Sequence, residues 1–132
     1  MYRPTDTTIM SNLIQFKKSI LNNGGASYNL LNGQLNPTDG FMVSIADHET
    51  ILKNNWIPQL QYHIASYIKE KAYILCGGLT NQRYFIGAWV ENDDLYFDIS
   101  IKVTTSEEAE RIAKDNNQLA YYDNGKKTII YL

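Results

Sequence analysis

The chain has 132 residues, of which 44% are hydrophobic, and a formal net charge of −2; this is the size and composition of one domain with its own core. The slight acidity argues against a general nucleic-acid-binding protein, because neutralising phosphates requires an excess of Lys and Arg. There is no run of about 18 apolar residues and no basic start followed by an apolar stretch, so neither a membrane span nor a secretory signal is expected. We therefore predict a single compact domain over residues 1–132, located in the cytoplasm.

The first half of the chain predicts two helices and two short strands. Apolar residues at helical spacing indicate helices over 7–22 and 57–70. Between them, turn signals at 32–33 and 36–40 separate β-prone pieces at 26–31 and 41–45, which we interpret as two strands with a tight reversal. The apolar run 72–76 is expected to be a buried strand. It contains the only cysteine, Cys76, which excludes an internal disulfide and any multi-cysteine zinc site.

The second half predicts two hairpins and a short helix. The stretch YFIGAWVENDDLYFDISI, residues 84–101, forms the first hairpin around the turn 91–94. Thr105 and Glu108 fit a capping box for a helix over about 106–117. A second hairpin follows, with Asn124-Gly125 as a two-residue turn. Strands grouped in hairpins favour an α+β fold, with a mainly antiparallel sheet and three helices packed on it.

In a symmetric first hairpin, one face of the sheet is apolar and is the expected core face. The expected cross-strand pairs on it are Val90/Leu95, Ala88/Phe97, Ile86/Ile99 and Tyr84/Ile101. The other face mixes aromatic residues with a carboxylate, because Trp89 lies across from Tyr96, and Gly87 across from Asp98. Two interpretations stay open: a helix covers this second face, with Gly87 allowing close approach, or the face is an exposed aromatic patch of the kind favoured at protein interfaces.

Acidic residues gather in one part of the sequence. Residues 91–115 hold eight acidic side chains against three basic ones. The pairs Glu107/Arg111 and Glu110/Lys114 have i,i+4 spacing, which is typical of a solvated helical face. The remaining carboxylates form one acidic edge only if the hairpin turn and the helix ends meet in the fold. Our candidate partner-binding residues are Trp89, Glu91, Asp93, Asp94, Tyr96, Asp98, Glu108 and Asp115.

Catalytic motifs are missing from the sequence. It has no HExxH, no paired CxxC, no phosphate-binding GxxxxGK[ST] and no GxSxG. His63 lies within a predicted helix, and His48 stands between Asp47 and Glu49, whose side chains diverge and make a poor metal site. A metal-independent ribonuclease or transferase using His48, Arg83 and Lys102 remains an alternative. We expect no catalytic residue, no cofactor and no metal.

Three phrases together resemble a set of small proteins and domains encoded by bacteriophages and other mobile elements. They are GGASYNLLNGQLNPTDGFMVSI, YFIGAWVENDDLYFDISIKV and EEAERIAKDNNQLAYYD, and the resemblance covers about three-quarters of the chain. The matching positions are Gly24, Gly25, Gly33, Gly40, Val43, Ser44, Gly87, Trp89, Tyr96, Asp98, Ser100, Ala109, Asn117, Gln118, Ala120 and Asp123.

This resemblance implies a context more than a mechanism. Small phage proteins without catalytic motifs include inhibitors of bacterial defence, such as anti-restriction and anti-CRISPR proteins, whose targets often have basic grooves for nucleic acid. The resemblance therefore implies a non-enzymatic inhibitor that binds a basic host protein or ribonucleoprotein, without binding nucleic acid directly. A second alternative is a virion or regulatory component that self-associates through its tyrosine-rich strands, which include Tyr121, Tyr122 and Tyr131.

Overall fold

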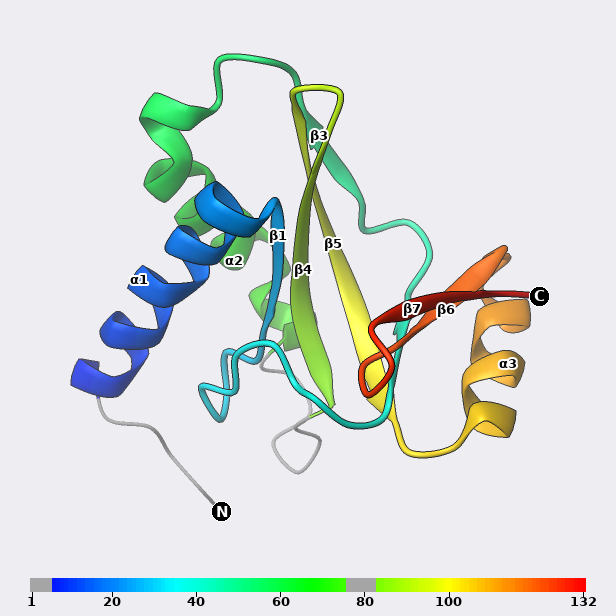
Figure 1. Ribbon diagram of the computed structural model, residues 1–132. Helices are drawn as coiled ribbons and strands as arrows, with labels where there is room; N and C mark the ends of the chain where they lie inside the picture. Colours follow the sequence, from blue (N-terminus) through cyan, green and yellow to red (C-terminus); the bar gives the residue numbers. More distant parts are fainter. Residues whose placement is uncertain (1–5, 76–82) are drawn as a thin grey trace.

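The computed structural model describes the backbone of residues 6–75 and 83–132, and the side chains of residues 13–75 and 83–132. The described part is an α+β fold with a seven-stranded antiparallel sheet and three α-helices (Figure 1). The helices and strands, together with one short 3-10 helix, are α1 (Asp6–Asn23), β1 (Gly25–Tyr28), β2 (Phe41–Ser44), β3 (Thr50–Leu52), η1 (Ile57–Gln59), α2 (Leu60–Leu75), β4 (Tyr84–Glu91), β5 (Asp94–Val103), α3 (Ser106–Asp115), β6 (Ala120–Asp123) and β7 (Thr128–Tyr131).

The central β4–β5 hairpin has the register expected from its sequence. All eight expected core-face residues pair as predicted, from Tyr84 with Ile101 to Val90 with Leu95. Six of these side chains are buried, and Tyr84 and Val90 are partly buried against the same cores. The alternation of apolar side chains therefore sets the pairing, because a shift by one residue would turn the whole apolar set to the opposite face.

The strand order along the sheet is β1-β4-β5-β2-β6-β7, and β3 also pairs with β5. Strands β1 and β2 do not form the predicted tight reversal. β1 pairs with β4, while β2 pairs with β5 and β6, so the long β4–β5 hairpin separates them. The first strand is also shorter than expected, because Asn29 turns the chain: its carbonyl accepts from the Gly33 amide and its side chain accepts from the Leu31 amide.

The other corrections concern elements whose boundaries depend on tertiary contacts. Residues 72–75 continue α2 instead of forming a strand, and Leu75 is 1% exposed within the main core; Cys76 lies outside the described residues. β3 was missed because its three residues, Thr50–Leu52, are set by pairing with β5. In the last hairpin, Asp123 pairs with Thr128, so the loop spans 124–127 and is not the predicted two-residue turn.

All three helices contact the same face of the sheet. The main core joins Phe16 and Ile20 of α1 and Tyr67 of α2 to the first face of β4 and β5, including Ile86 and Phe97. A second cluster places Ala109 and Ala113 of α3 on β2 and the far part of β5. Within the described residues, no helix is long and apolar enough to cross a bilayer.

Candidate functional site

The second face of the β4–β5 hairpin carries a row of paired side chains whose environment changes along the strands. Trp89 pairs with Tyr96, Gly87 with Asp98 and Phe85 with Ser100, as predicted. Phe85 is fully buried, and Asp98 and Ser100 are 6% and 8% exposed. Among the described residues, the helical side chains of both core clusters contact the opposite face.

Trp89 and Tyr96 form a stacked aromatic pair near the turn of the hairpin. Their ring planes are 9° from parallel, with centroids 5.2 Å apart, and both residues are partly exposed. Strand alternation places Glu91 and Asp94, the next pair along the hairpin, on this same face. We call Trp89, Glu91, Asp94 and Tyr96 the hairpin-tip patch.

The neighbouring elements hold the turn of the hairpin in place. The buried Trp56, just before η1, donates from Nε1 to the carbonyl oxygen of Asp93 at 2.9 Å. Lys53, after β3, forms an ion pair with Asp94 at 3.3 Å. The hydrogen bond from the buried Trp56 and the ion pair of Lys53 therefore position the turn beside the patch. The side chains of Glu91, in the patch, and Asp93, in the turn, remain exposed.

Asp98 belongs to the same row but is enclosed. Its carboxylate accepts a 2.5 Å hydrogen bond from the Ser44 hydroxyl of β2. A Cβ built on Gly87 would overlap Asp98 Oδ1, so the glycine is what admits the carboxylate. Burial raises the pKa of Asp98 to about 6, against the lowering effect of the Ser44 hydrogen bond and with a further increase from the charge of Glu49. A side chain so enclosed contributes charge and structure, not direct contact with a partner.

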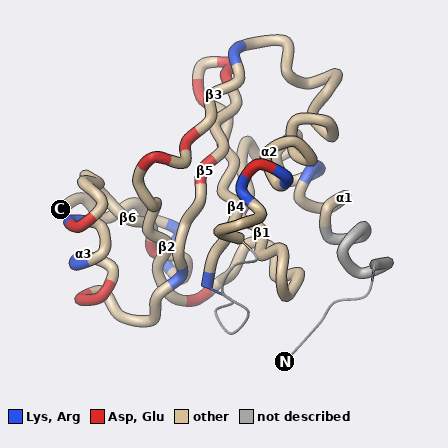
Figure 2. The backbone as a smooth tube through the Cα atoms, turned by 180° about the vertical axis from the view of Figure 1, so that it is seen from behind, with Lys and Arg blue, Asp and Glu red and all other residues tan. Residues whose placement is uncertain are grey.

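The predicted carboxylates do not form one acidic edge. The β4–β5 turn lies at one end of the long hairpin, whereas α3 follows the opposite end of β5; both views show them apart (Figures 1 and 2). Glu108 contacts Arg83, with its Oε1 2.7 Å from the guanidinium, and Asp115 forms an i,i+4 ion pair with Arg111 at 3.8 Å. The structure thus brings together the hairpin residues and leaves Glu108 and Asp115 in a separate group.

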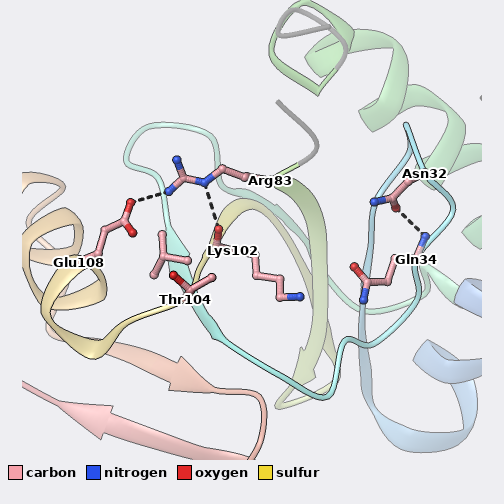
Figure 3. Close-up of a pocket in the computed structure, with 7 residues that line it drawn as sticks. Asn32, Gln34, Arg83, Lys102, Thr104 and Glu108 are labelled. Carbon is pink, nitrogen blue, oxygen red and sulfur yellow. Dashed lines mark hydrogen bonds and ion pairs between the residues drawn. The ribbon is translucent and has the colours of Figure 1, made fainter. Parts of the chain in front are cut away.

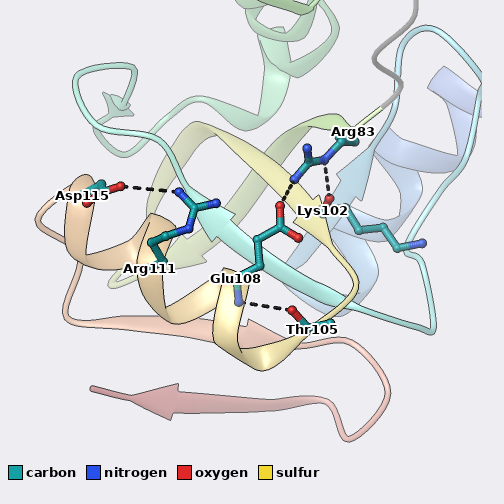
Figure 4. A network of polar contacts seen from close by, with 6 residues as sticks. All are labelled: Arg83, Lys102, Thr105, Glu108, Arg111 and Asp115. Carbon is teal, nitrogen blue, oxygen red and sulfur yellow. Dashed lines mark hydrogen bonds and ion pairs between the residues drawn. The ribbon is translucent and has the colours of Figure 1, made fainter.

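That separate group is a polar network at the start of α3. Arg83 donates from Nε to the Lys102 carbonyl as well as to Glu108, and Thr105 caps the helix by accepting from the Glu108 amide at 3.2 Å (Figure 4). Half of the predicted capping box is therefore present, while the Glu108 carboxylate binds Arg83. The predicted Glu110/Lys114 pair forms at 2.9 Å, whereas Arg111 pairs with Asp115 instead of Glu107.

A polar pocket of about 500 Å³ lies beside this network (Figure 3). Its lining includes Asn32 and Gln34 from the loop after β1, with Arg83, Lys102 and Glu108. The two cations are engaged, Arg83 by Glu108 and Lys102 by Asp39 at 2.6 Å. No sequence pattern could have indicated this pocket, because its residues come from three separate segments.

Of the three groups in the ribonuclease alternative, the structure brings together Arg83 and Lys102 and holds the backbone of His48 further along β5. The His48 carbonyl accepts from the Tyr67 hydroxyl of α2 at 2.7 Å, and Thr50, two residues later, pairs with Phe97. Arg83 donates from Nε to the carbonyl of Lys102. Lys102 is five residues beyond Phe97 along β5, which corresponds to about 16 Å of strand. Among residues 13–75 and 83–132, no group of three His, Cys, Asp or Glu side chains could hold a metal ion.

Comparison of the chain with protein-family models, with curated proteins and with solved structures gave no match.

Proposed function

We propose that the protein is a non-enzymatic binding protein and that the hairpin-tip patch is its contact surface for a partner with a basic surface. The observation that carries the proposal is the shared face of Trp89, Tyr96, Glu91 and Asp94, with the aromatic rings stacked and partly exposed. Arginine suits such a surface, because its guanidinium stacks on aromatic faces and forms bidentate pairs with carboxylates.

The wider role that we propose follows the resemblance to phage and mobile-element proteins. In that role the protein inhibits a host nucleic-acid-processing defence complex, such as a CRISPR effector, in the cytoplasm of the host cell. Carboxylates beside a stacked aromatic pair can occupy a groove that normally holds phosphates and stacked bases. The modest net charge of −2 supports blocking of one local site over mimicry of DNA by the whole surface.

The test uses a panel of purified defence nucleases, with binding measured by biolayer interferometry and inhibition measured by cleavage. Trp89→Ala with Glu91→Lys should weaken binding at least tenfold and restore cleavage. The matched control is Glu107→Lys, an exposed α3 residue away from the hairpin. If wild type binds none of the panel, or if the control loses as much affinity as the patch variant, the proposed surface is wrong.

A second candidate function, self-association, is supported by the exposed edge of the sheet. β7 is the last strand in the strand order. It contains no charged residue and no proline, which are the residues that commonly prevent an edge strand from pairing with another chain. Its side chains Ile129 and Tyr131 are 55% and 74% exposed. Leu132 donates its amide to Leu119, and strand alternation then directs the backbone polar groups of Ile129 and Tyr131 away from β6.

These features define one self-complementary register. In an antiparallel pairing of two copies of β7 with Ile130 opposite Ile130, Ile129 of each copy lies opposite Tyr131 of the other. The outward amide and carbonyl groups of these residues then form hydrogen bonds between the two copies. The pairs are apolar and oppose no like charges. Light scattering should then show a dimer, which Ile129→Lys should convert to a monomer. The control variant Thr38→Lys, in the loop before β2, should remain a dimer. A wild-type protein that is monomeric at high concentration excludes this candidate function.

A further inference from the structure

Helices α1 and α2 leave between them an open apolar groove that the proposed function does not use. Its volume is about 680 Å³. Ile64 of α2 is buried at 6% exposure, whereas Ile14 and Leu21 of α1 are 51% and 44% exposed. Ile14 and Leu21 are seven residues apart, so they lie on one side of α1, and Ala65 and Ile68 line the groove from α2.

The charges around this groove have one sign. Lys17 and Lys18 line it from α1, Lys69 lines it from α2, and none of the lining residues that the structure describes is acidic. These three lysines form no ion pair within the described part of the chain. Because both walls carry cations, a complementary occupant needs an apolar centre with negative charges along both sides.

From these observations we infer that the groove binds an acidic amphipathic helix of a partner protein. The exposed Ile14 and Leu21 on the α1 wall are seven residues apart, which corresponds to about 10.5 Å of helix. Three apolar anchors at i, i+4 and i+7 of a bound helix span the same length. Glu or Asp residues flanking the anchors would reach Lys17 and Lys18 on one wall and Lys69 on the other.

The distribution of charge favours a helix over a lipid chain, because cations line both walls of the groove. A fatty acid has a single carboxylate at one end and would leave at least one wall of lysines without a partner. Helix α3 of a second copy is also unsuitable, because its apolar residues Ala109 and Ala113 are fully buried in their own domain.

The test is fluorescence polarisation of a labelled 16-residue peptide with three Leu anchors and Glu flanks, titrated with the full chain. Wild type should bind it with an affinity that falls as salt rises, and should not bind the same peptide with Ser anchors. The triple variant K17E/K18E/K69E should lose at least tenfold in affinity and should gain affinity for a peptide with Lys flanks. Ala65→Trp should block the groove and weaken binding of the Glu-flanked peptide without changing the charge of the groove.

The matched control is K126E/K127E, which reverses two exposed lysines in the loop between β6 and β7; its affinity should equal that of wild type. Circular dichroism and melting temperature establish that each variant is folded. The inference is overturned if wild type does not bind the Glu-flanked peptide, if the triple variant binds it equally well, or if dodecanoate binds wild type in place of the peptide. Trp89→Ala should leave peptide binding unchanged, which separates this result from that of the hairpin-tip patch.

Discussion

Gly87 and Asp98 form a cross-strand pair in which the missing side chain of one residue makes space for the carboxylate of the other. This pair lies between the partly exposed Trp89/Tyr96 pair and the buried Phe85/Ser100 pair. Gly87→Ala should therefore destabilise the fold by about 1–3 kcal/mol, the usual cost of overpacking. Urea denaturation measures this change in the free energy of unfolding.

The comparison variant is Gly125→Ala, where the nearest atom to an added Cβ is Asp123 Oδ1 at an ordinary 3.5 Å. We expect its free energy of unfolding to stay within about 0.5 kcal/mol of wild type. Equal stability of the two variants would show that Asp98 moves freely out of the space above Gly87.

Asp98 should make stability depend on pH between about 4 and 6. Its pKa is raised from 3.8 to about 6 by burial, so the folded state binds the proton more tightly than the unfolded state. The free energy of unfolding should therefore rise as pH falls through this range, and the gain is lost as pH rises above 6. Two pKa units correspond to about 3 kcal/mol.

Asp98→Asn removes this titration while keeping an oxygen that can accept from Ser44. The difference between wild type and variant, measured by denaturation at several pH values, isolates the contribution of this one group. A difference that does not vary between pH 4 and 7 would contradict a raised pKa.

Glu108 and Asp93 should respond differently to charge reversal. Glu108→Lys places a second cation beside Arg83, whose guanidinium is 2.7 Å from the present carboxylate, and it should lower stability. Because both side chains are partly exposed, we expect a loss of about 1 kcal/mol. Thermal unfolding should show a lower melting temperature for Glu108→Lys and little change for Asp93→Lys, which reverses an exposed side chain. Equal melting temperatures would indicate that the Arg83 pair adds no stability.

Trp56 should position the hairpin-tip patch through its bond to Asp93. Trp56→Phe retains much of the buried ring but removes the Nε1 donor to the Asp93 carbonyl, which should cost about 1 kcal/mol. Amide hydrogen exchange should become faster in the β4–β5 turn and remain unchanged in β6 and β7. Uniform acceleration over the whole sheet would mean that Trp56 acts through global stability instead.

The sequence alone determines the features that depend on neighbouring residues. The alternation over 84–101 predicted the β4–β5 register and the pairing of Trp89 with Tyr96, and Thr105 indicated the start of α3. These features depend on periodicity and on a local cap. Five of the eight candidate site residues, Asp98 and the four of the hairpin-tip patch, accordingly share a face as their positions in the hairpin require.

Tertiary structure decided the features that join distant segments. Residues 72–75 are apolar enough for a strand or a buried helix, and packing of Leu75 in the main core selects the helix. The insertion of the β4–β5 hairpin between β1 and β2 separates strands that are close in sequence. Glu108 and Asp98 are both carboxylates, and the sequence does not distinguish their environments. In the fold, Glu108 pairs with Arg83, whereas burial raises the pKa of Asp98. Local periodicity specifies which side chains share a face of an element. Only the packed fold specifies which of them are exposed to solvent and which form hydrogen bonds or ion pairs with residues distant in sequence.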